Sequence, residues 1–172
     1  MSWDIMKYKA GGDNVRPMAH MVFSMLASAA SAQPKPCDTG LSPDLAESWR
    51  WVDDTTFEVK IRQGVKFHNK APVNGRELTA EDVTYSYRRG FFTEPVGGVS
   101  TVASQVKDVV AVDRYTVQFL TKVPLGILPE TLAWKYSLVI LAKESGGAKE
   151  TWEDPAASWI GSGPFVFERH LP

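Results

Sequence analysis

Hydrophobic and polar residues alternate along residues 55–62. The apolar residues of this stretch would share one face of a strand: Phe57, Val59 and Ile61. A period of two with a single apolar face is typical of an antiparallel sheet that is half exposed to water. The Asp53-Asp54 dipeptide just before it is a turn signal. The pattern therefore predicts a hairpin whose first strand covers residues 49–52.

The same pattern returns in residues 106–112 and 115–121, on either side of the Asp113-Arg114 dipeptide. Tyr115, Val117 and Phe119 would again share a face, which predicts a second hairpin. Two hairpins separated by segments with helical signals indicate an α+β fold. We expect a small, mostly antiparallel sheet of two hairpins with flanking helices.

The strongest helix signal is Thr79-Ala-Glu-Asp82, a capping-box pattern that begins a helix over residues 80–89. Three weaker patterns predict helices over residues 14–30, 41–48 and 124–134; the second begins with Ser42 as cap and Pro43 at the first helical position. Two apolar segments remain: residues 137–142 are expected to be a strand or a buried segment, and residues 164–168 a final strand.

Composition places the chain among ordinary globular proteins. It has 172 residues, a formal net charge of -1, 44% hydrophobic and 23% charged residues, enough for one domain with a core. The balanced, interspersed charges provide no electrostatic footprint for nucleic acid. No run of 18 apolar residues occurs, so no membrane span is predicted. The single cysteine, Cys37, cannot form an internal disulfide and is interpreted as an incidental loop thiol.

Residues 18–33 imitate a secretory signal peptide, with an apolar core and an Ala-Ser-Ala-like cleavage site. The charges upstream of it are mixed, since Asp4 and Asp13 stand among the basic residues. The segment also fits the predicted helix over residues 14–30. We therefore interpret it as part of the fold, and an export signal is not evident in the chain.

No cluster of reactive residues predicts catalysis or a metal site. The paired carboxylates Asp53-Asp54 and Glu81-Asp82 occupy a turn and the first turn of a helix, where acidic residues are common for structural reasons. His20, His68 and His170 are far apart in the sequence and lack the clustered ligands of a zinc site. We therefore expect no catalytic residue, no metal and no cofactor.

The Gly161-Ser-Gly-Pro164 segment is interpreted by the backbone conformations that it allows, not by reactive groups. No Lys-Ser/Thr pair follows, so it is not a phosphate loop, and it lacks the Gly-x-Ser-x-Gly order of a nucleophile elbow. Its two glycines allow close backbone approach or a positive φ, and Pro164 restrains the entry to the next segment.

Four blocks, in this order, resemble the family 5 extracytoplasmic solute-binding proteins, the peptide- and nickel-binding receptors of ABC importers. They are Pro43-Asp-Leu-Ala-Glu-Ser-Trp49, Thr56-Phe-Glu-Val-Lys-Ile-Arg-Gln-Gly-Val-Lys-Phe-His68, Leu78-Thr-Ala-Glu-Asp-Val-Thr-Tyr-Ser-Tyr-Arg88 and Ile160-Gly-Ser-Gly-Pro-Phe165. The hairpin from Val109 to Phe119 is similar to the family's Val-Asp-x-Tyr-Thr-Val-x-Phe hairpin.

The resemblance implies that the chain is part of lobe I of a two-lobed, hinged periplasmic-binding-protein fold (type II, cluster C). It would be a single partial lobe over residues 1–172. Residues 1–40 would form an N-terminal helix and loop, residues 41–160 the family 5 subdomain, and residues 161–172 a return strand toward the main lobe. Because the second lobe and both hinge crossings are missing, we interpret the chain as a fragment or truncated product.

By resemblance, the function is that of a substrate-binding component, not an enzyme, which captures oligopeptides or dipeptides in the periplasm or elsewhere outside the cytoplasmic membrane. Nickel chelates and oligosaccharides are also bound among the relatives. The implied partners are a peptide or other small solute and, through the full-length receptor, an ABC permease; an exposed lobe surface could also pair two copies. The alternative is a freestanding single-lobe binding or interaction module, and a hydrolase has little support.

The candidate ligand-binding residues lie near the end of the chain. In the family, the Gly161-Ser162-Gly163 turn resembles the return from the subdomain to the main lobe, near the cleft, where its backbone could contact a ligand. Trp159, just before the turn, is the best aromatic candidate for a cleft wall. A purely structural turn and a core-packing Trp are the competing interpretations.

Overall fold

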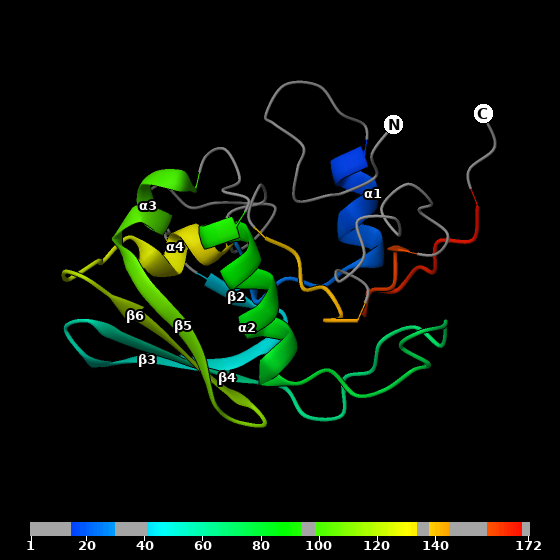
Figure 1. The fold of residues 1–172 in the computed structure, drawn as a ribbon, viewed down its shortest axis with the longest axis horizontal. Coiled ribbons are helices and arrows are strands. Elements are labelled where there is room, and N and C mark those ends of the chain that lie inside the picture. The colour runs from blue at the N-terminus through cyan, green and yellow to red at the C-terminus, as the bar shows by residue number, and fades with distance from the viewer. Residues whose placement is uncertain (1–14, 30–40, 94–98, 134–137, 145–157, 170–172) are drawn as a thin grey trace.

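The computed structural model describes residues 15–29, 41–93, 99–133, 138–144 and 158–169 (Figure 1). The helical elements are α1 (Val15–Val22), α2 (Ala80–Arg88), the π-helical turn η1 (Arg89–Thr93), α3 (Ser100–Gln105) and α4 (Leu128–Ala133). The strands are β1 (Ala27–Ala29), β2 (Leu41–Pro43), β3 (Ala46–Asp53), β4 (Thr56–Ile61), β5 (Val106–Asp113) and β6 (Thr116–Thr121).

The two predicted hairpins join into one four-stranded antiparallel sheet with the order β3-β4-β6-β5. The second strands of the two hairpins pair with each other, and Phe57 lies opposite Phe119. One row of side chains crosses all four strands on the inner face, in the order Trp51, Phe57, Phe119 and Val109. The last three have at most 2% of their surface exposed, whereas Trp51 at the sheet edge has 37%.

Helix α2 covers the inner face over β5 and β6, as Figure 1 shows. The ring of Tyr87 meets the ring of Phe119 edge-on at a centroid distance of 5.0 Å, a favourable arrangement of two aromatic quadrupoles. On the outer face, Glu58 links three strands by accepting hydrogen bonds from Arg50 on β3 (3.0 Å) and Gln118 on β6 (2.9 Å). The sheet therefore has one apolar and one polar face, as the alternation predicts.

The predicted start of α2 is confirmed. Thr79 is the N-cap, and its backbone N–H donates to Asp82 Oδ2 at 3.0 Å. Leu78 and Val83, the expected hydrophobic staple, are both fully buried. The capping box therefore determines where the helix begins.

The helix predicted over residues 14–30 is wrong beyond Val22, because the backbone groups that follow find partners in distant segments. Ser24 O accepts the N–H of Ile140 at 2.9 Å, and the N–H of Met25 donates to Asp44 Oδ2 at 2.9 Å. The chain then enters β1, which pairs with β2 in a two-stranded antiparallel sheet. Tertiary hydrogen bonds outweigh the local helical pattern here.

The short helix predicted over residues 41–48 is also wrong, since this segment forms β2 and the start of β3. Ser42, the expected cap, lies opposite Ser28 of β1, and Pro43 ends the strand, where a missing N–H is tolerated. The final strand predicted over residues 164–168 is not formed. The N–H of Phe165 donates to Met21 O in the last turn of α1, at 3.1 Å, and the described residues after it join no ladder.

Three other expectations are confirmed. Helix α4 lies within the predicted range 124–134. Residues 138–142 form a buried segment without strand pairing, held on α2 where Ser86 Oγ accepts the N–H of Leu141 at 2.9 Å. The fold class, α+β with mostly antiparallel pairing, is the one observed. The boundaries at residues 40 and 160 stay a prediction, as does the role of Cys37, which lies outside the described residues.

Candidate functional site

The Gly161-Ser162-Gly163 turn lies directly against the end of α1. The N–H of Gly163 donates to Val22 O at 2.8 Å. A Cβ atom at Gly161 would overlap this same carbonyl oxygen, and one at Gly163 would lie 2.6 Å from Met21 O. Neither glycine has a positive φ. Of the two uses expected for these glycines, close backbone approach is therefore the one observed.

A loop far away in the sequence holds the same turn from another side. The backbone N–H of His68 donates to Gly161 O at 2.8 Å, and His68 Nε2 lies 2.8 Å from Gly163 O. Ser162 Oγ lies 3.0 Å from Ser24 Oγ. Both ends of the turn and its central side chain are thus tied to segments that the sequence places 93 or more residues earlier.

Trp159, two residues before this turn, is fully buried. Its ring centroid is 5.8 Å from that of Phe23, just past α1, and 5.3 Å from that of Phe167. The structure therefore brings Trp159 close to residues 161–163, as a packing residue with no exposed surface in this arrangement. A contact between this ring and a ligand stays a prediction.

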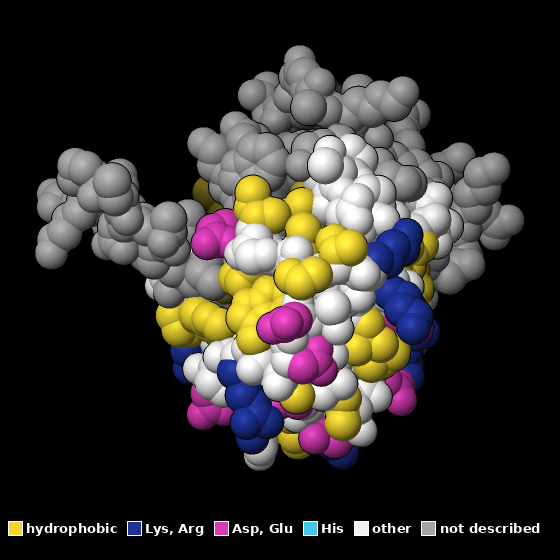
Figure 2. Space-filling model, turned by 90° about the vertical axis from the view of Figure 1, so that its left-hand side faces the viewer, with side chains coloured by type: hydrophobic (Ala, Val, Ile, Leu, Met, Phe, Trp, Pro, Cys, Tyr) yellow, Lys and Arg dark blue, Asp and Glu magenta, His cyan; other side chains and the backbone are white. Residues whose placement is uncertain are grey.

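Apolar side chains are exposed next to the turn. The exposed fractions are 51% for Met21, 61% for Phe165 and 54% for Val166. The hydrogen bond from Phe165 N–H to Met21 O places two of these residues side by side. The opposite end of the molecule, which Figure 2 shows, carries apolar side chains interspersed with acidic and basic ones, without a field of one sign.

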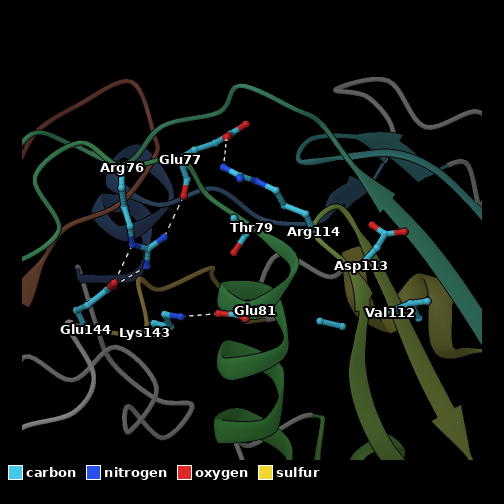
Figure 3. A pocket seen from close by; sticks show the side chains of 10 residues that line it. Arg76, Glu77, Thr79, Glu81, Val112, Asp113, Arg114, Lys143 and Glu144 are labelled. Carbon is cyan, nitrogen blue, oxygen red and sulfur yellow. Dashed lines mark hydrogen bonds and ion pairs between the residues drawn. The ribbon is translucent and has the colours of Figure 1, made fainter.

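A second candidate is a charged hollow between the start of α2, the β5–β6 turn and the segment around residue 143 (Figure 3). Its volume is about 680 Å³. Three ion pairs lie in its wall: Arg76 with Glu144, Lys143 with Glu81, and Arg114 with Glu77. Because each of these cations faces a carboxylate, the three pairs leave no unpaired cation in the hollow to attract an anionic ligand.

The pKa shifts of this cluster follow from its hydrogen bonds. The bond from Arg76 lowers the pKa of Glu144. The pKa of Glu77 is also lowered, chiefly because the Gly64 N–H donates to its carboxylate, with further contributions from the Tyr115 hydroxyl and Arg114. Each shift favours the ionised carboxylate. The cluster therefore behaves as a structural ion-pair network rather than as a set of proton-transfer groups.

Arg76 and Glu77 both take part in this ion-pair network. Arg76 bonds to Asp82 and to Glu144, which is 68 residues away in the chain. No local pattern indicates the second of these pairs. In contrast, the structural interpretation of the paired carboxylates is confirmed: Asp53 accepts the Thr55 N–H in its turn at 2.8 Å, and Asp82 caps α2.

The described residues contain no group of three His, Cys, Asp or Glu side chains that could hold a metal ion. His20 and His68 lie on separate elements, and His170 is outside the described part of the chain. In that part, every helix is too short or too polar to cross a membrane.

Residues 40–172 match the family model of the bacterial extracellular solute-binding proteins, family 5 Middle. Because this match covers most of the chain, the protein belongs to that family. Di/tripeptide-binding protein 2 of Pseudomonas aeruginosa is 30% identical over 167 residues, which cover 88% of this chain and 30% of that protein.

Solved structures of solute-binding proteins have the same fold. The oligopeptide-binding protein AppA from Bacillus subtilis, in complex with a nonapeptide, matches with a TM-score of 0.76 and 26% identity over 99% of this chain and 32% of its own. MoaA from A. tumefaciens R10, in complex with mannopinic acid, matches with a TM-score of 0.79 and 24% identity over 100% of this chain and 33% of its own. The chain spans about a third of the length of these relatives.

Proposed function

We propose that this chain supplies part of a receptor that captures peptides outside the cytoplasmic membrane for an ABC importer. The observation that carries the proposal is the family match over residues 40–172. The peptide class is supported by the 30% identity to a di/tripeptide-binding protein and the fold shared with an oligopeptide-binding protein. The receptor binds its ligand without converting it chemically, and the full-length form delivers it to a permease.

The Gly161-Ser162-Gly163 turn is the part of the described chain that we assign to ligand contact. Two features support this assignment. The turn is held by hydrogen bonds at both ends, so its backbone is preorganised, and it lies next to the exposed apolar side chains of Met21 and Phe165. An extended peptide presents both backbone polar groups and apolar side chains, which such a surface would complement.

Ligand-dependent thermal unfolding of the 172-residue chain tests the proposal. The probes are Met-Leu, a tripeptide and a nonapeptide, with free amino acids as the comparison. A ligand that binds only the folded state raises the Tm in a concentration-dependent way. At a free-ligand concentration of one hundred times Kd, the free energy of unfolding increases by about 2.7 kcal/mol. Failure of every peptide to raise the Tm at millimolar concentration would contradict peptide binding by this chain.

A matched pair of serine variants tests the location of the site. Ser162→Ala removes the hydroxyl at the turn, and Ser104→Ala removes one at the end of α3, where Ser104 Oγ donates to Thr101 O at 2.7 Å. We expect a weaker peptide-induced shift in Ser162→Ala alone. Equal shifts in both variants would argue against a contact at the turn.

The mass of each peptide after incubation with the chain tests the absence of chemical conversion. Unchanged masses support a receptor, and cleaved products would indicate a hydrolase. Cell fractionation tests the location of the protein, which we expect outside the cytoplasmic membrane. Recovery with cytoplasmic proteins only would argue against a receptor that captures solutes outside the cell.

A further inference from the structure

A closed loop carries His68 to the 161–163 turn. The loop is joined at its base, where the N–H of Phe67 donates to Arg76 O at 3.0 Å and Lys66 forms a β-bridge with Glu77. The carbonyl oxygen of His68 accepts two further bonds from within the loop, from the N–H groups of Lys70 (2.8 Å) and Gly75 (3.2 Å). Hydrogen bonds within the loop therefore fix the backbone of His68, independently of the contact that its side chain makes with the turn.

The side chain of His68 has one chemically consistent protonation pattern in this environment. The carbonyl oxygen of Gly163 can only accept, so Nε2, at 2.8 Å, must carry the hydrogen. Nδ1 is buried and has no hydrogen-bond partner among the described residues. A hydrogen on Nδ1 would be an unsatisfied buried donor, which is costly, so Nδ1 carries the lone pair. The contact with Gly163 O thus assigns a ring hydrogen to Nε2.

We propose that His68 is the positioning residue of the candidate ligand-binding turn. Its backbone N–H holds Gly161 and its ring holds Gly163, so a single residue sets both ends of the three-residue turn. Two residues farther along the same loop, Lys70 Nζ donates to Phe167 O at 2.8 Å and holds the segment that follows. This inference rests on the proposed function in assigning ligand contact to the turn.

The consequence is preorganisation. A turn that is already fixed in its binding geometry loses little conformational freedom when a ligand binds, and this raises the affinity. The close approach of Gly161 and Gly163 to α1 fixes the turn from one side only. Without the His68 ring, the Gly163 carbonyl group would lose its donor and the turn would gain freedom on that side.

The ring tautomer is tested on the unaltered protein by NMR with ¹⁵N-labelled histidine. We expect His68 to show the pattern of a neutral ring with its hydrogen on Nε2. The tautomer with the hydrogen on Nδ1 would overturn the inference, because that ring cannot donate to Gly163. This measurement depends neither on a ligand nor on a variant that must fold.

Two substitutions test the positioning role in the free protein. His68→Phe keeps a ring but removes the donor, and His68→Gln restores a side-chain N–H at similar reach. We expect hydrogen exchange of the Gly163 and Phe165 amides to be about tenfold faster in His68→Phe, the equivalent of one lost hydrogen bond, and near the original rate in His68→Gln. Exchange of Val59 and Val83 in the core reports general loosening; equal acceleration there, or none at the turn, would overturn the inference.

Peptide affinity separates this inference from the proposed function. With Met-Leu as the probe, His68→Phe should weaken binding about tenfold and His68→Gln should restore most of it. If the unaltered chain binds peptide and His68→Phe binds it equally well, the positioning role is wrong. If the unaltered chain binds no peptide, the proposed function fails, while the tautomer and exchange experiments still decide the role of His68.

Discussion

Arg76 donates to both carboxylate oxygens of Asp82, with an Nη1–Oδ2 distance of 2.8 Å and an Nη2–Oδ1 distance of 2.6 Å. The Asp82 side chain has no exposed surface. The same carboxylate caps α2 and accepts the backbone N–H of Lys143 at 3.2 Å. One buried charge therefore joins the loop before α2, the helix itself and the segment near residue 143.

Removal of Arg76 should destabilise the protein more than removal of an exposed arginine. Arg76→Ala leaves the Asp82 carboxylate buried without its cation, at a cost of roughly 2–4 kcal/mol. The matched control is Arg88→Ala, because Arg88 also pairs with Asp108 through two bonds, but at an exposed site; its removal should cost at most about 1 kcal/mol. Urea unfolding measures both, and equal losses would contradict the buried-charge argument.

Gly161 should tolerate no side chain. In Gly161→Ala the new methyl group would overlap Val22 O, a backbone atom that cannot move independently, so we expect a loss of roughly 1–3 kcal/mol. Gly126→Ala is the control, because a Cβ atom there meets nothing within 4 Å; it should leave stability unchanged or raise it by up to about 1 kcal/mol. Thermal unfolding measures both changes in stability. Equal changes in the two variants would show that the close approach of Gly161 to α1 does not limit the side chain at this position.

Stability should fall in acid partly through Glu77. Its pKa in the folded protein lies below the ordinary value of 4.5, because the Gly64 N–H, Tyr115 and Arg114 favour the carboxylate. The unfolded chain then binds more protons near pH 4.5, so this stabilisation is present above that pH and is lost as the pH falls through the folded-state pKa. The difference in urea midpoint between the unaltered protein and Glu77→Gln should shrink between pH 6 and pH 3; a constant difference would contradict it.

The central strand offers a test of the two faces of the sheet. Phe119 is fully buried and contacts the ring of Tyr87, so Phe119→Ala should cost about 3–5 kcal/mol. Leu120, its neighbour on the other face, is partly exposed, and Leu120→Ala should cost no more than about 1 kcal/mol. Urea unfolding of the two variants measures the difference, and similar losses would indicate that the outer face is covered.

Several elements could be predicted because their signals act over a few residues. The alternation around Phe57 and Phe119, the Asp-containing turns and the Thr79–Asp82 capping box each predict an element at the correct place. The predictions were wrong for segments whose hydrogen-bond partners lie in distant parts of the chain. Ser42 looks like a helix cap but pairs with Ser28, fourteen residues earlier in the chain. A local pattern cannot report a partner outside its own window.

The candidate site divides in the same way. The sequence by itself determined that Gly161 and Gly163 act through their backbone, that each hairpin has one apolar face, and that the four ordered blocks are those of one family. These properties depend on residue type and on short spacings. Only the tertiary structure decided that His68 holds the turn, that Trp159 packs against Phe23 and Phe167, and that Arg76 pairs with both Asp82 and Glu144. These contacts join distant segments, and their geometry arises from packing the whole core, which no single segment of the chain specifies.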